Sequence, residues 1–392
     1  MNPNTKDRRY ETLDDCGPLW AGEPFRIFFP LGMCAAVIGV LLWPLFYSGI
    51  WRLPPLLQHP RVMIFGFGGA FLCGFLGTAW PRFLEAEALR AKEVILLVCA
   101  WMAAMVFILS GHLQYGDFAF GVFLLLLLVI LLRRLRKDRD VPPPGFALAM
   151  VSVVLSSAAA FLWALAPLQG GLWLINFSRL ILWQGMLLLP LMGVGSYLFA
   201  RFFQEPGKKP VAATPKNRAV GVWLGAILVV ASFAVEASGQ IRLGSGVRFV
   251  AIVVWVLLAS PALWKGKAST SRAWALRIAV GSIALTCFVR MIWPGPGHAF
   301  AHVLFIGGFG LTLLLVADRV THGHCGDISQ LPKKSRLWRW IVWLALLAVA
   351  TRASADFKTS LIISHHSYAA LLWSAVVVAF AWCTAGMWRK SN

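Results

Sequence analysis

The sequence predicts an all-α membrane protein, a helix bundle with about twelve transmembrane helices. Hydrophobic residues make up 59% of the 392-residue chain and charged residues only 13%, and the mean hydropathy is +0.73. These proportions exclude an ordinary soluble domain. The apolar residues also lie in separate stretches of about 20, the length that a helix needs to cross the hydrocarbon core of a bilayer.

Twelve stretches have this length, and prolines mark many of their ends. Pro54, Pro60 and Pro81 border the second stretch, whereas Pro190 lies inside the sixth and should kink its helix. Several connections are so short that neighbouring helices should form antiparallel hairpins. In chain order the expected spans are 26–48, 62–80, 93–111, 115–132, 146–167, 177–200, 219–238, 247–264, 273–292, 298–318, 337–354 and 366–388.

The distribution of Lys and Arg predicts the orientation of the bundle. Alternate connecting segments, counted from the N-terminus, hold 28 of the 36 basic residues, and cytoplasmic loops are the ones enriched in such residues. Both termini are therefore expected in the cytoplasm. The formal net charge of +20 is explained by this orientation in the lipid bilayer, and no nucleic acid partner is expected, because the basic residues form no continuous stripe.

These features predict a single membrane domain with short polar ends. We expect a cytoplasmic N-terminal tail at 1–25, the membrane domain at 26–388 and a cytoplasmic C-terminus at 389–392. A polar linker at about 201–218 would divide the domain into two six-helix halves.

Six of the eight histidines are expected at the outer boundary of the membrane. They are His59, His112, His298, His302, His365 and His366. The charged residues expected at the same depth are Arg61, Arg179, Glu236, Arg290 and Arg352. Charges inside a membrane are costly, and perturbed ionisable groups gather at functional sites. The pattern therefore predicts a site near the outer face.

The residue types at this level indicate metal or haem chemistry. Imidazole is a ligand for copper, iron and haem, and guanidinium groups pair with carboxylates such as the propionates of haem. His298 and His302 share a helix face, so they can bind one copper ion together but cannot occupy opposite faces of a haem. Two-histidine haem ligation needs different helices, for example the tenth with the second or twelfth.

The candidate residues form two overlapping sets. The candidate metal ligands are His59, His112, His298, His302, His365, His366 and Met63, whose thioether suits Cu(I). The candidate cofactor-binding residues are His59, His302, His365, His366, Arg61, Arg179, Arg290 and Arg352. In an alternative interpretation there is no functional site: His112 and the other histidines snorkel at the interface, and the arginines anchor helix ends.

The stretch H-G-H-C-G at the inner end of the tenth span permits two interpretations. His322, His324 and Cys325 resemble a small metal-binding cluster. They also resemble a polar helix end with a glycine stop, which is the interpretation we favour.

Several longer motifs resemble those of one family. They are P-F-R-I-F-F-P-L-G at 24–32, H-P-R-V-M-I-F-G-F at 59–67, G-F-L-G-T-A-W-P at 74–81, H-V-L-F-I-G-G-F-G at 302–310 and R-V-T-H-G-H-C-G at 319–326. With these motifs the chain resembles the NnrS family over most of its length. Residues that match the family pattern are His59, Met63, Phe65, Gly66, His302, Arg319 and His324.

The resemblance implies a haem- and copper-containing protein of the bacterial cytoplasmic membrane that protects against nitric oxide. Its site would face the periplasm, and its small ligand would be nitric oxide or a related molecule. Arg61 and Val62 stand where the family pattern has a second histidine and a glutamate, which puts copper in doubt. No electron donor and no pair of carboxylates for acid and base catalysis can be identified, so turnover is not predicted.

Two other functions fit the sequence. Twelve spans with intramembrane Arg179, Glu236, Arg290 and Arg352 would suit a transporter of a small anionic or zwitterionic solute, although transporter sites usually lie near the midplane. A scaffolding protein with incidental histidines is the third possibility. An absorption spectrum separates the haem protein from the transporter, because only the haem protein is coloured.

Overall fold

The computed structural model describes residues 18–135, 144–169, 171–204, 211–295, 297–325 and 335–388. Within these ranges the chain forms helices and no β-strand. Twelve of the described helices are long and apolar enough to cross a membrane. The predicted fold class, an all-α bundle with about twelve spans, is confirmed.

Some spans are single helices and others are composite. The first six are α2 (Phe25–Tyr47), α3 with η3 and α4 (Pro55–Arg61, Val62–Gly68, Gly69–Phe83), α5 (Ala91–Leu109), α6 (Leu113–Leu132), α7 (Pro144–Gln169), and α8 with η4, α9 and η5 (Leu172–Leu180, Ile181–Gly185, Met186–Leu198, Phe199–Phe203). The last six are α10 (Pro215–Ala237), α11 (Ile241–Ala259), α13 (Ser271–Ile292), α14 with η6 and α15 (Gly297–His302, Val303–Gly310, Leu311–Cys325), α16 (Arg336–Phe357), and η8 with α17 (Thr359–Leu361, Ile362–Trp388). Two further helices, α1 (Leu19–Gly22) and α12 (Ala262–Lys265), are too short to span.

Several spans extend well beyond the predicted apolar stretches, as three examples show. The second begins at Pro55 instead of 62, the sixth begins at Leu172 instead of 177, and the tenth continues to Cys325 instead of 318. Hydropathy detects only the part of a helix that lies in hydrocarbon, whereas a helix continues into the polar interface wherever its backbone hydrogen bonds do. As a result, His59 lies inside a helix and not in the loop before it.

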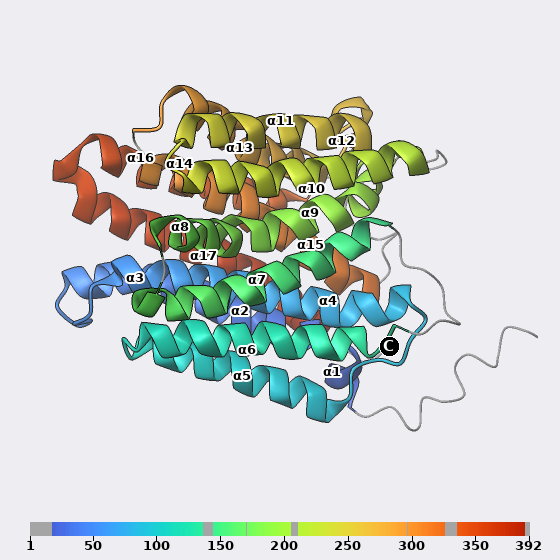
Figure 1. The fold of residues 1–392 in the computed structure, drawn as a ribbon, viewed down its shortest axis with the longest axis horizontal. Coiled ribbons are helices and arrows are strands. Elements are labelled where there is room, and N and C mark those ends of the chain that lie inside the picture. Colours follow the sequence, from blue (N-terminus) through green and yellow to red (C-terminus); the bar gives the residue numbers. More distant parts are fainter. Residues whose placement is uncertain are drawn as a thin grey trace, which may run out of the picture.

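The helices run side by side between two ends of the bundle (Figure 1). The turns at 48–54, 110–112, 238–240, 293–295 and 358 lie at the left in that view, and we call this the histidine end. The last described turn of α17 and the short helix α1 lie at the opposite end, called the terminal end. The histidine end holds the turns that the sequence predicts at the outer face.

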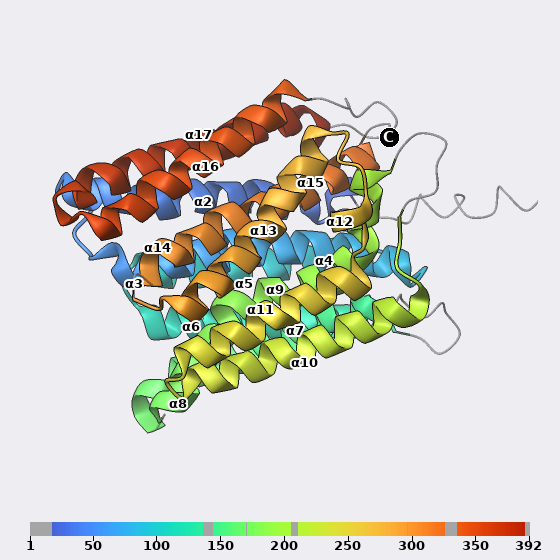
Figure 2. The same ribbon diagram turned by 90° about the horizontal axis from the view of Figure 1, so that it is seen from above.

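Helices that are adjacent in the sequence pack together, and so do some helices that are far apart in the sequence. The pairs α5 with α6, α10 with α11 and α16 with α17 are hairpins, as expected from their short connections. The first long helix, α2, also packs against the last, α17, while α10 packs against α7 and α8. Figure 2 shows α16 and α17 beside α2 along one side of the molecule and α10 and α11 along the opposite side.

Three of the described spans contain a π-helical segment. The segment η3 begins three residues after His59, η6 begins directly after His302, and η4 begins two residues after Arg179. In a π-helix the hydrogen bonds span five residues instead of four, and such segments are frequent at functional sites. Two of the predicted histidines therefore precede a widened helix turn.

Candidate functional site: a histidine-lined cavity

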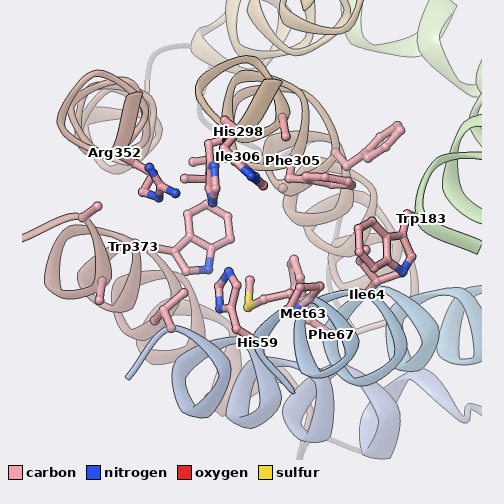
Figure 3. Close-up of a pocket in the computed structure, with 18 of the residues that line it drawn as sticks. His59, Met63, Ile64, Phe67, Trp183, His298, Phe305, Ile306, Arg352 and Trp373 are labelled. Atoms are coloured by element: carbon pink, nitrogen blue, oxygen red, sulfur yellow. Dashed lines mark hydrogen bonds between the residues drawn. The ribbon is translucent and has the colours of Figure 1, made fainter. Parts of the chain in front are cut away.

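A cavity of about 150 Å³ lies between the second, tenth and twelfth spans towards the histidine end. Its polar lining consists of four histidines and one arginine, namely His59, His298, His302, His366 and Arg352. Most of the remaining wall is apolar or aromatic. Figure 3 shows His59 and Met63 on one side of the cavity, His298 on the other, and the indole of Trp373 between them. This arrangement of a few polar groups in an apolar hollow is typical of a ligand site.

Glycines in the π-helical segments allow the surrounding helices to come close. A Cβ at Gly310 of η6 would lie 2.5 Å from Cη2 of Trp373, and one at Gly66 of η3 would lie 2.8 Å from the Cβ of Ala35. These two glycines therefore leave room for α17 and α2 to pack against η6 and η3. The glycine-rich motifs after His59 and His302 bring the neighbouring helices close beside the cavity.

His59 and His302 face each other from different helices. Their ring centroids are 6.4 Å apart and their ring planes differ by 19°. His59 Nδ1 lies 2.8 Å from the carbonyl oxygen of Gly39, and His302 Nδ1 lies 2.8 Å from that of His298. A carbonyl oxygen only accepts, so each Nδ1 carries the proton and each Nε2 has a lone pair for a metal. Such an outer hydrogen bond is the usual support of a ligating histidine.

His366 and Arg352 contribute the other polar groups near this pair. His366 is buried, with its Nδ1 2.8 Å from the hydroxyl of Tyr47 and its ring edge-on to Trp43 at 4.9 Å between centroids. Arg352 donates from Nη1 to Asp356 at 2.9 Å. The guanidinium thus adds a positive charge to a cavity whose imidazoles come from three spans.

Two of the six predicted histidines lie outside the cavity wall. Nδ1 of His365 lies 2.8 Å from the hydroxyl oxygen of Ser354. The same hydroxyl donates its hydrogen to the carbonyl oxygen of Thr351. His112 is exposed at the start of α6, beside Tyr115. Their positions at the histidine end agree with the predicted depth, but they do not contribute to the cavity lining.

Arg61 points away from the cavity and pairs with Asp117 of α6. Its Nε and Nη2 donate to the two carboxylate oxygens at 2.7 and 2.8 Å, and both side chains are buried. Sequence reasoning did not single out Asp117. A lone acidic residue in an otherwise apolar span is the signal that would have found it, since a buried charge needs a partner.

Arg179 and Arg290 belong to a second charged cluster. Glu236 accepts from Arg290 at 2.9 Å and from Arg248 at 2.6 Å, and Arg248 also donates to Gln184 at 2.9 Å. Arg179 lies over the ring of Trp183, 5.7 Å from its centroid. Arg248 is only 2% exposed and lies inside α11. Sequence reasoning did not single out Arg248 as a partner of Glu236.

The predicted gathering of all these groups around one centre therefore occurs only in part. The cavity wall contains His59, His298, His302, His366, Met63 and Arg352. Arg61 and Arg290 pair with carboxylates on neighbouring helices, and Arg179 lies over Trp183 of its own span. Trp43, Trp183 and Trp373 also line the cavity, and no sequence pattern distinguished them from the other tryptophans.

The histidines at the terminal end form ionic contacts. His324 Nδ1 lies 2.9 Å from Glu23 Oε1, which also accepts from Arg82 at 2.6 Å, while Arg26 donates to the other oxygen. Burial raises the pKa of Glu23, but the hydrogen bonds from His324 and Arg26 outweigh it and hold the pKa below its ordinary value. In the part of the chain that the structure describes, no three His, Cys, Asp or Glu side chains are arranged to hold a metal ion. These contacts favour the polar helix end over a metal cluster.

The fold and the cavity define a multi-spanning α-helical membrane protein with an enclosed imidazole-containing site. The family described as NnrS protein matches residues 18–390, so the chain belongs to the NnrS family. This confirms the resemblance seen in the motifs. No curated protein matches the sequence significantly.

Proposed function

We propose that this chain is a haem-binding protein of the bacterial cytoplasmic membrane that protects against nitric oxide, with His59 and His302 as the haem ligands. The observation that carries the proposal is the pairing of these two imidazoles across the cavity, 6.4 Å apart between ring centroids. Ligation on both faces of a haem requires residues from different elements, and these two come from the second and tenth spans.

The donor atoms of the two side chains fit haem iron, whereas the cavity of about 150 Å³ matches a benzene-sized ligand, so its walls would have to move apart to admit a haem. Both carry their proton on Nδ1, because a backbone carbonyl accepts there, and both leave Nε2 free for a metal. Arg352 lines the same cavity, and among the described residues it donates only to Asp356. Its other N–H groups are suited to a carboxylate such as a haem propionate.

Copper is a second candidate for the same cavity. Met63 lines it together with His59, and thioether and imidazole ligands together suit Cu(I). However, the described residues contain no set of three His, Cys, Asp or Glu side chains arranged around one metal position. The donor set therefore fits two-histidine haem ligation better than a copper site with three protein nitrogens.

The cavity residues would bind and orient the group and exclude water. Bound haem would supply an iron centre, and nitric oxide would coordinate to it by displacing His59 or His302. His59 and His302 would fix the iron, Arg352 would neutralise a carboxylate, and the apolar walls would keep the site dry. We further propose that the cavity faces the periplasm, because the connecting segments at the histidine end alternate along the chain with those whose Lys and Arg content predicts a cytoplasmic location.

The test is the haem content of the protein purified from haem-replete cells. The wild type should show a Soret band with redox-sensitive visible bands. His59→Ala and His302→Ala should each lose most of the haem. Changing a residue that only supports a metal ligand weakens binding by up to roughly 100-fold, and loss of the ligand itself should weaken it by at least as much. Monodisperse elution and an unchanged thermal midpoint would show that the variants still fold.

His112→Ala is the matched control, because His112 is exposed and does not line the cavity. It should retain the full haem content. Full retention by His59→Ala or His302→Ala would show that the ligands are wrongly assigned. A colourless wild type would contradict the haem proposal and favour the transporter.

A further inference from the structure

A second cavity lies deeper in the bundle than the histidine-lined one. It has a volume of about 60 Å³ and lies between α2, α4, α9, η5, η6 and α15. Along α9 its wall runs from Leu187 to Leu198, and along α15 it reaches Val316. Eleven residues of helix correspond to about 16 Å, so this cavity extends from the level of the histidine site towards the terminal end.

The wall of this second cavity offers no polar group to a ligand. All of its lining side chains are apolar except that of Thr312, whose hydroxyl donates to the carbonyl of Gly308 at 2.8 Å. A buried water needs two to four polar partners, and cavities lined by Leu, Ile and Phe stay dry and take up xenon or benzene. The second cavity therefore suits a small uncharged apolar molecule and disfavours water and ions.

The two cavities share part of their walls. Leu187, Phe309 and Leu313 line both of them. A Cβ added to Gly68 would lie 3.3 Å from Cδ1 of Leu187, so glycine at this position leaves that leucine room. A small molecule moving from one cavity to the other would therefore pass these three side chains.

Part of the wall of the second cavity is only partly buried. Phe75, Leu198 and Val316 line it and are of intermediate burial, and all three belong to helices with the length and composition of membrane spans. Apolar molecules favour hydrocarbon over water. In a bilayer, an uncharged gas would therefore be concentrated in the hydrocarbon around these helices.

We propose that the second cavity is a binding site for uncharged diatomic gases, which enter it from the bilayer and pass by Leu187, Phe309 and Leu313 to the histidine-lined cavity. The destination rests on the proposed function, whereas the gas site itself depends only on the apolar wall. A lipid chain is disfavoured because about 60 Å³ is well below the 150 Å³ of an apolar cavity that takes up benzene.

The first test places xenon in crystals of the full-length protein under pressure. Xenon density is expected within the wall of the second cavity. Val194→Phe should remove it, because Val194 is 6% exposed and lines only this cavity of the two. Val253→Phe, the same change at a shallow surface hollow on α11, should leave xenon in place.

The second test measures the association of carbon monoxide with the haem-loaded protein after flash photolysis. Val194→Phe should slow the bimolecular rate severalfold without changing the Soret band, and Val253→Phe should not. Absence of xenon from the wild type, a lipid or detergent chain in its place, or an unchanged rate in Val194→Phe would overturn the proposal. A protein without haem would refute the proposed function, yet the xenon experiment would still decide the gas site.

Discussion

At the scale of single residues, the arginines show how partners decide a side chain's direction. Arg61 follows His59 by two residues, yet its side chain contacts Asp117, whereas His59 faces the cavity. The pair is bidentate and almost entirely buried, with 7% and 2% of the two side chains exposed. A buried charge without its partner is costly, so the position of Asp117 fixes that of Arg61.

Replacing Asp117 by alanine should destabilise the protein by about 3–5 kcal/mol, because Arg61 then remains as an uncompensated buried charge. The measurement is the free energy of unfolding in detergent. The double variant Arg61→Leu with Asp117→Leu should recover much of the loss, since apolar replacement of a whole buried pair is often neutral.

Glu87→Ala is the control for this prediction. Glu87 pairs with Arg90 at the surface, where 78% of the arginine side chain and 65% of the glutamate side chain are exposed. An exposed pair contributes less than about 1 kcal/mol. Equal losses for Asp117→Ala and Glu87→Ala would contradict the argument from burial.

At the scale of helices, glycine determines how closely the spans approach. Gly145 of α7 and Gly193 of α9 meet backbone to backbone, and a Cβ on Gly193 would collide with the carbonyl oxygen of Gly145. Small residues allow such close packing between membrane helices, where van der Waals contact replaces the hydrophobic effect. The α7 and α9 contact holds the sixth span, which supplies Trp183 and Leu187 to the cavity.

Gly193→Ala should lower the free energy of unfolding by about 1–3 kcal/mol, because a carbonyl oxygen cannot move aside as a flexible side chain can. The thermal midpoint in detergent reports the change. Gly281→Ala in α13 is the matched control, since a Cβ there meets nothing within 4 Å. Its midpoint should stay the same or rise, and a comparable fall in both variants would argue against the close contact.

At the scale of the whole molecule, the two ends of the bundle differ in charge and content. The cavity lies towards the histidine end, whereas most Lys and Arg residues of the sequence fall in the alternate connecting segments. This asymmetry is what predicts a cytoplasmic location for both termini. The direction of the bundle decides whether the proposed haem would meet periplasmic or cytoplasmic partners.

Reporter fusions test this orientation. Alkaline phosphatase needs disulfides, which form outside the cytoplasm. It should be active when fused after Gly239, in the turn at the histidine end, and inactive after Glu87, in the turn between α4 and α5. A fluorescent protein that folds only in the cytoplasm should give the opposite pattern. Alkaline phosphatase activity after Glu87 but not after Gly239 would show that the bundle has the opposite orientation.

The sequence by itself determined the helices, their number and the level of the histidines. Spans are detectable because hydrocarbon demands long apolar segments with internally satisfied backbone groups, a local requirement. The same requirement marks His59, His302 and Arg352 as unusual polar residues near one face. Helix ends such as Pro55 and Leu172 were less well predicted, since the interface tolerates polar residues.

Only the tertiary structure decided which of these groups share a cavity. His302 faces His59, whereas His365 lies beside Ser354, and Arg61 and Arg290 turn to carboxylates on other helices. The second, apolar cavity also exists only through the packing of six elements. Hydropathy gives the depth of a residue in the membrane, but the rotation and packing of each helix decide which neighbour its side chain meets.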